Sequence, residues 1–68
     1  MEPETEHILE NIRKIRLEKD ISVLNLSLDV GISHSHLFYI ESKRTIPSID
    51  VLVRIAKALD VQLYELIN

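Results

Sequence analysis

The chain contains a single glycine, Gly31, which lies between two short segments that have the periodicity of helices. In the first segment Leu26 and Val30 recur four positions apart, and in the second Leu37 and Ile40 recur three positions apart. Each pair therefore lies on one face of a helix. Glycine adopts the left-handed backbone conformation without the steric penalty of a β-carbon, so Gly31 permits a tight turn. The segment predicts two short helices joined at a sharp angle.

Apolar residues with helical spacing also lie on both sides of this pair, and they predict five helices in all. The expected ranges are about 3–19, 22–30, 33–42, 48–59 and 63–67. Ser22, Ser33 and Ser48 are suited to capping the second, third and fourth helices. The fourth helix carries an apolar stripe formed by Ile49, Leu52, Ile55, Ala56 and Leu59. No segment has the pattern of a strand, so the expected fold class is all-α.

The length of 68 residues corresponds to one domain at the small end of the range that folds unaided. We expect residues 1–68 to form this single domain, with residues 1–7 as an N-terminal segment and the start of the first helix. The absence of cysteine excludes disulfides and cysteine-based zinc sites. No apolar run approaches the roughly 20 residues that cross a membrane, and the N-terminus is acidic where a signal peptide is basic. A soluble intracellular protein with no membrane partner is expected.

The net charge of −3 argues against a nucleic-acid partner, because neutralisation of phosphates by Lys and Arg dominates that affinity. The acidic residues are unevenly placed, however. Four of them lie in the first ten residues, namely Glu2, Glu4, Glu6 and Glu10. Eight basic and seven acidic residues then remain over residues 11–68. This nearly neutral remainder leaves DNA binding open.

The segment from Val23 to Glu41 has the layout of a DNA-reading helix-turn-helix, with the small residue Ser27 where the two helices approach each other. The chain resembles the phage repressor/Cro-type (xenobiotic-response-element-type) helix-turn-helix family over residues 8–67. The resemblance is carried by Ile12-Arg13-Lys14-Ile15-Arg16-Leu17-Glu18-Lys19, Leu26-Ser27, Gly31-Ile32-Ser33, Ile40-Glu41, Pro47-Ser48 and Ile55-Ala56-Lys57-Ala58-Leu59. It implies a compact five-helix, lambda-repressor-like domain with its helix-turn-helix at about residues 22–42. It also implies a cytoplasmic transcriptional regulator, such as a repressor, of bacterial, archaeal or phage origin, and a partly buried ion pair between Arg16 and Glu41.

In such a protein the start and the outer face of the third helix enter the major groove. The residues expected to contact bases are His34, Ser35, His36, Phe38 and Tyr39. Histidine and serine hydrogen-bond base edges, and the ring of Phe38 suits a thymine methyl group. The residues expected to contact phosphates are Ser22, Ser42, Lys43, Arg44, Thr45 and Arg13. Many relatives carry a glutamine as a further phosphate contact at the position of Val23, which cannot donate such a hydrogen bond.

Two further features depart from the pattern of the family. Asp20, Lys43 and Asp60 stand where helix-ending glycines are frequent, and left-handed geometry strains Lys43 more than the aspartates. Leu24 and Leu28 place apolar side chains on a face of the second helix that is usually polar in relatives. Either the N-terminal segment covers these leucines, which we expect, or a protein partner does.

A single domain of this size makes a small contact with DNA, so we expect a homodimer on an inverted-repeat operator. Family analogy and apolar composition place the dimer interface in the C-terminal region, at Tyr64, Leu66 and Ile67. The alternative is a protein-interaction module or antitoxin that keeps the fold and binds a protein through Leu24 and Leu28, and through the surface of Phe38 and Tyr39.

An enzyme is not expected, because the chain has no cysteine, no glycine-rich phosphate loop and no ordered Ser-His-Asp constellation. A metal site is not expected either, since His34 and His36, two positions apart on a helix, point in different directions. The sequence indicates no cofactor.

Overall fold

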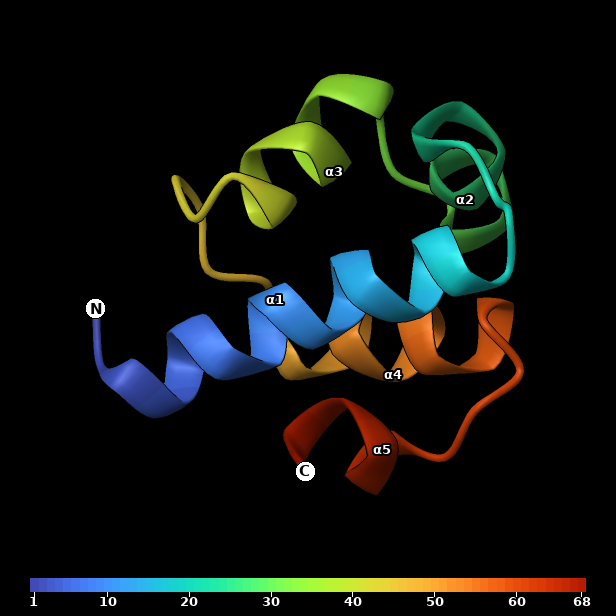
Figure 1. Cartoon of the computed structure of the whole chain (residues 1–68). Coiled ribbons are helices and arrows are strands. Elements are labelled where there is room, and N and C mark those ends of the chain that lie inside the picture. The colour runs from blue at the N-terminus through green and yellow to red at the C-terminus, as the bar shows by residue number, and fades with distance from the viewer.

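The computed structural model describes all residues 1–68 and consists of five helices without a strand (Figure 1). The helices are α1 (Pro3–Glu18), α2 (Val23–Val30), α3 (His34–Glu41), α4 (Ile49–Ala58) and α5 (Leu63–Ile67). The predicted all-α, five-helix fold is confirmed, and the helix ends agree with the expected ranges to within about one residue. None of the five helices combines the length and the hydrophobicity that a membrane span requires.

Serine side chains cap the N-termini of the three central helices, as their positions predict. The hydroxyl oxygens of Ser22, Ser33 and Ser48 each accept a hydrogen bond from the backbone N–H three residues later, at 3.0, 3.0 and 3.1 Å. Each cap satisfies an N–H group that has no partner within the helix and contributes about 1 kcal/mol. These local interactions explain why α2, α3 and α4 begin where they do.

The turns after the first four helices each pass through one residue in the left-handed region. Gly31 follows α2 with φ of 83°. Asp20, Lys43 and Asp60 follow α1, α3 and α4 with φ of 58°, 65° and 58°. The expectation that these three residues replace helix-ending glycines is confirmed. Lys43 carries a steric penalty of roughly 1–2 kcal/mol, because its side chain lacks the short polar group that eases this conformation in aspartate.

The core contains apolar side chains from all five helices and the α4–α5 connection. Its members are Leu9, Ile12, Leu26, Val30, Leu37, Ile40, Val51, Ile55, Ala56, Leu59 and Leu66. Ile49 belongs to the apolar stripe of α4 by its spacing but not to the core, because it is 73% exposed at the first position of the helix. The assignment of Leu66 to a dimer surface is wrong, because its side chain is fully buried inside this domain.

Helix α1 is central, with α2 and α3 on one side of it and α5 on the other (Figure 1). Hydrogen bonds tie its N-terminal half to the end of α5. The amide nitrogen of Asn11 donates to the carbonyl oxygen of Leu66 at 2.9 Å, and the Nε2 of His7 lies 2.9 Å from the carbonyl oxygen of Asn68. The start of α1 therefore packs toward α5 and does not reach across α2.

The outer face of α2 consequently stays open to solvent. Leu24 and Leu28 are 52% and 69% exposed. The expectation that the N-terminal segment covers these leucines is wrong, because that segment is engaged with α5.

Candidate nucleic-acid interface

Helices α2 and α3 pack on each other through buried side chains that face inward from both. Leu26 and Val30 of α2 and Leu37 and Ile40 of α3 are each at most 2% exposed. Ser27 is buried with them, and its hydroxyl donates a hydrogen bond of 2.7 Å to the carbonyl oxygen of Leu24. Burying an unpaired hydroxyl is unfavourable, so this bond removes the penalty at that position. The two helices form one unit whose remaining faces point outward.

The outward face of α3 carries two pairs of residues, each pair four positions apart. His34 and Phe38 form one pair, and Ser35 and Tyr39 form the other. Such spacing stacks side chains on one face of a helix, and all four residues are exposed. Together with Arg44 they line a shallow hollow. His36 is half-buried and lies outside that hollow, so the structure separates it from the other residues predicted to contact bases.

Two aromatic rings dominate this face. Phe38 and Tyr39 are 48% and 42% exposed, and their ring centroids lie 5.9 Å apart in an edge-to-face arrangement. The guanidinium of Arg44 lies 5.7 Å from the centroid of the Tyr39 ring, within the range of a cation–π interaction. The carbonyl oxygen of Tyr39 also accepts the backbone N–H groups of Arg44 and Thr45, at 2.9 and 3.2 Å. The loop after α3 is thus folded back on the end of the helix.

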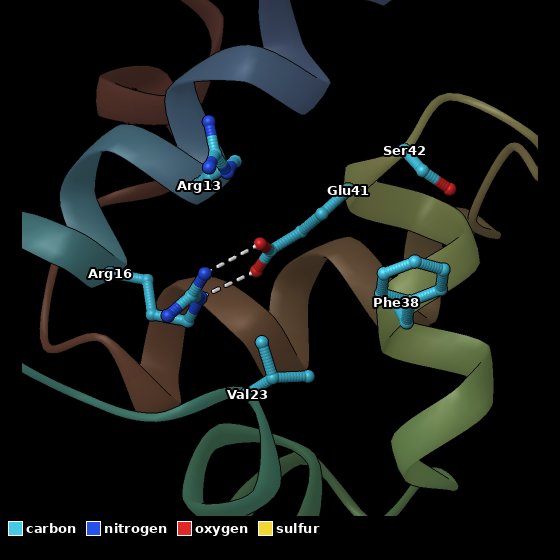
Figure 2. Close-up of a pocket in the computed structure, with 6 residues that line it drawn as sticks. All are labelled: Arg13, Arg16, Val23, Phe38, Glu41 and Ser42. Carbon is cyan, nitrogen blue, oxygen red and sulfur yellow. Dashed lines mark hydrogen bonds and ion pairs between the residues drawn. The ribbon is translucent and has the colours of Figure 1, made fainter.

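A buried ion pair joins α1 to the end of α3. Arg16 donates from Nε and Nη2 to the two carboxylate oxygens of Glu41, at 2.7 and 2.8 Å (Figure 2). It also donates from Nη1 to the carbonyl oxygen of Ile21, just before α2, at 2.8 Å. The side chains of Arg16 and Glu41 are only 8% and 6% exposed. The hydrogen bonds that Arg16 donates to Glu41 raise the pKa of Arg16, which keeps the guanidinium charged. One side chain therefore links α1, α3 and the entry to α2.

A second hollow lies beside this ion pair, where α1, α2 and α3 meet (Figure 2). Arg16 and Glu41 form part of its lining. The other lining residues are Arg13, Val23, Phe38 and Ser42. Arg13 is exposed and forms no ion pair, so its charge is open to a ligand. Phe38 lines both hollows, so it lies between the aromatic hollow on α3 and the hollow that contains Arg13.

The polar residues predicted to contact phosphates differ in how far the protein already engages them. Ser22 only accepts in its helix cap, which leaves its hydroxyl hydrogen available to a ligand. The hydroxyl of Ser42 donates to the carbonyl oxygen of Tyr39 at 3.3 Å. Thr45 is half-buried, whereas Arg44 is exposed. Together with Arg13, Ser22 and Arg44 therefore offer a donor outward without rearrangement.

Lys43 is engaged by an acidic residue that sequence reasoning missed. Its ammonium forms an ion pair with Glu10 of α1. The hydrogen bond and charge of Lys43 lower the pKa of Glu10, and the hydrogen bond and charge of Glu10 raise the pKa of Lys43. The two residues are 33 positions apart in the chain, so no local signal indicated the contact. A phosphate approaching Lys43 meets a lysine that already has an anionic partner.

The C-terminal region presents apolar side chains on the surface. Tyr64 and Ile67 are exposed, unlike the buried Leu66 between them. Ile46 and Ile49, around the start of α4, are exposed as well and were not predicted to be. All four side chains are more than half exposed.

The sequence matches a helix-turn-helix family model of the Cro/C1 type over residues 12–66. A comparison with proteins of curated function found no match. Several solved structures also resemble the chain, among them two transcription regulators and a restriction-modification controller protein.

The restriction-modification controller protein C.AhdI from Aeromonas hydrophila matches with a TM-score of 0.86 and 24% identity, over 93% of this chain and 94% of that chain. The hypothetical transcription factor NHTF from Neisseria has a TM-score of 0.86 and 26% identity, over 94% of this chain and 75% of that chain. SinR, the master regulator for biofilm formation, was solved in complex with DNA. It has a TM-score of 0.80 and 34% identity, over 90% of this chain and 98% of that chain.

Proposed function

Since this chain belongs to the Cro/C1-type helix-turn-helix family, we propose that it is a transcriptional regulator that binds double-stranded DNA sequence-specifically as a homodimer, with α3 in the major groove. The observation that carries the proposal is the exposed outer face of α3, held in a fixed orientation by the core and by the ion pair between Arg16 and Glu41. A reading helix requires this combination of free side chains and rigid support. The complex of the relative SinR with DNA supports the same partner here.

The base contacts come from the start and outer face of α3 in this proposal. The residues are His34, Ser35, Phe38 and Tyr39, with His36 at the flank of the helix. Imidazole and hydroxyl groups hydrogen-bond base edges, and aromatic rings make apolar contacts. The shared hollow on α3 is the surface that faces the bases.

The proposed phosphate contacts come from α1, from the residue before α2 and from the loop after α3. Arg13 lines one hollow with Ser42 and another with Lys43, so these residues gather near the C-terminal end of α3. Ser22, Arg44 and Thr45 complete the set. Such contacts orient a helix in the groove without reading sequence. Arg13 takes the place of the glutamine that many relatives carry at Val23, because both residues line the hollow beside α3.

Dimerisation supplies the contact area that one small domain lacks. Two copies related by a two-fold axis read two half-sites about one helical turn apart, roughly 34–36 Å from centre to centre. Tyr64 and Ile67 are the proposed contacts between the copies. Sedimentation that shows only monomer at high protein concentration, with or without operator, would remove this part of the proposal.

Selection from a randomised duplex pool, followed by affinity measurements across salt concentrations, tests the proposal as a whole. We expect an inverted repeat to be enriched, and the logarithm of affinity to fall with the logarithm of salt by about 0.9 per phosphate contact. Arg44→Ala weakens binding to all sequences and flattens this slope. Lys57→Ala is the matched control, because Lys57 is an exposed cation in a hollow between the end of α4 and α5, away from α3.

A protein-interaction module or antitoxin is the second candidate, and the exposure of Leu24 and Leu28 favours it. Two apolar side chains one turn apart form a surface that a partner helix can cover. Binding through this surface is insensitive to salt, whereas binding to phosphates weakens steeply. Failure to enrich any duplex, together with no salt-sensitive DNA binding, would contradict the DNA-binding proposal and direct the search to a protein partner.

A further inference from the structure

The reading helix lacks the side chains that most often identify purines. Helix α3 has the sequence His-Ser-His-Leu-Phe-Tyr-Ile-Glu and contains no Arg, Lys, Asn or Gln. Arginine and lysine recognise guanine through two hydrogen bonds, and asparagine and glutamine recognise adenine in the same way. Helix α3 therefore cannot make these two-bond contacts. Its specificity has to come from another feature of the base pairs.

The feature that α3 does present is an apolar surface at its centre. Phe38 and Tyr39 are each nearly half exposed, although aromatic rings are stabilised by burial. The rings contact each other edge to face, and the guanidinium of Arg44 lies over the ring of Tyr39. The backbone hydrogen bonds that Tyr39 accepts further fix the end of α3. The aromatic surface is thus in place before any ligand binds.

We propose that the pair Phe38 and Tyr39 reads the 5-methyl group of thymine, so that the protein selects half-sites with thymine at the positions that face this pair. The inference rests on the proposed function. The thymine methyl is the apolar group that base pairs display in the major groove, whereas cytosine carries only a hydrogen at the same ring position. A cytosine facing the rings therefore lacks the apolar surface that the rings would remove from water.

The rim of the hollow favours DNA over an apolar protein surface as the occupant. The guanidinium of Arg44 lies on one side of the aromatic pair, and His34 and Ser35 lie on the other. A cationic rim attracts the phosphates that flank a groove, and the polar residues pair with base edges next to the methyl group. A polar and charged rim around an aromatic centre thus matches the mixed surface of the major groove.

Replacement of thymine by deoxyuridine tests the inference directly. The exchange removes only the methyl group and leaves the base pair and its hydrogen-bonding groups intact. Each thymine of the selected operator is replaced in turn, and affinity is measured by titration. We expect a loss of about three- to tenfold at one or more positions of each half-site, which corresponds to one buried methyl group.

Substitutions of Phe38 and Tyr39 test whether their rings cause the preference for thymine over deoxyuridine. With Phe38→Ala or Tyr39→Ala, the thymine and deoxyuridine operators bind equally, because the apolar surface has gone. Phe38→Leu retains part of the discrimination, since leucine is also apolar. His34→Ala is the matched control on the same face, and it lowers affinity while keeping the preference for thymine. Thermal unfolding of each variant shows that the fold is preserved, as expected for side chains that are about half exposed.

The outcomes separate this inference from the proposed function. An enriched operator with steep salt dependence and no sensitivity to deoxyuridine overturns the inference and leaves the DNA-binding proposal standing. The same holds if Phe38→Ala and Tyr39→Ala retain the full preference for thymine. Absence of any enriched, salt-sensitive duplex overturns both.

Discussion

Disruption of the ion pair between Arg16 and Glu41 should be among the most damaging changes to the charged residues of this protein. Glu41→Leu removes both carboxylate oxygens that accept from Arg16 and leaves the guanidinium with only its bond to the carbonyl of Ile21. Because the side chain of Arg16 is 8% exposed, water cannot replace the lost partners. A stranded charge of this kind costs about 3–5 kcal/mol. A domain of this length has a free energy of unfolding of about 3–10 kcal/mol, so the variant loses a large share of its stability.

The double variant Arg16→Met with Glu41→Leu separates the charge from the packing. It buries apolar side chains of similar length, so no charge is stranded. The remaining penalty is the hydrogen bond that Ile21 loses, about 1 kcal/mol. We therefore expect the double variant to be more stable than either single variant, although it carries two substitutions.

Urea unfolding followed by far-UV circular dichroism measures Glu41→Leu, Arg16→Met and the double variant against the parent chain. Single variants that lose less than about 1 kcal/mol would refute the reasoning, because the pair would then be solvated. A double variant as unstable as the sum of the single ones would refute it as well. DNA titration of the double variant tests a second consequence, namely that α3 binds operator more weakly once its end is no longer tied to α1.

Three further predictions concern the loop contact and the left-handed turns. Glu10→Gln frees Lys43 for phosphate, so affinity for DNA should rise and the salt slope should steepen by about 0.9; an unchanged slope in titrations would show that Lys43 does not reach the duplex. Lys43 lowers the pKa of Glu10 from its usual value of 4.5, so the pair stabilises the fold above that value and loses its effect as the pH falls through the lowered pKa. The small difference in Tm between the parent and Glu10→Gln should therefore vanish in acid, and a difference that persists there would contradict this. Gly31→Ala should lower the free energy of unfolding by about 1–2 kcal/mol, because φ is 83° and the new β-carbon lies 3.4 Å from Nη1 of Arg54. Asp60→Gly, at φ of 58°, is the opposite control and should leave stability unchanged or raise it in urea unfolding.

Local signals in the sequence were sufficient to predict where the helices lie and where they begin and end. The caps at Ser22, Ser33 and Ser48 act over three residues, and the left-handed turn at Gly31 needs only its own backbone freedom. Such interactions are complete within about one helical turn, so a pattern of residue types is enough to predict them. The family resemblance added the partnership of Arg16 with Glu41, which are 25 positions apart.

In helix α5 the sequence pattern does not determine which side chains are buried. It is only five residues long and almost entirely apolar, so periodicity could not show that Leu66 points into the core while Ile67 points out. The packing of α5 against α1 determines which of the two side chains is buried. In the same way, periodicity placed Leu24 and Leu28 on one face of α2, but only the course of α1 toward α5 decided that this face stays uncovered.

The sequence by itself therefore determined the five helices, their caps, the turn at Gly31 and the set of side chains on the outer face of α3. Only the tertiary structure decided the partner of Lys43, the exposure of Leu28 and the burial of Leu66. The physical reason is the range of the interactions. Capping and helical periodicity act between neighbours in the chain, whereas burial and ion pairing depend on how whole helices are rotated and packed against one another.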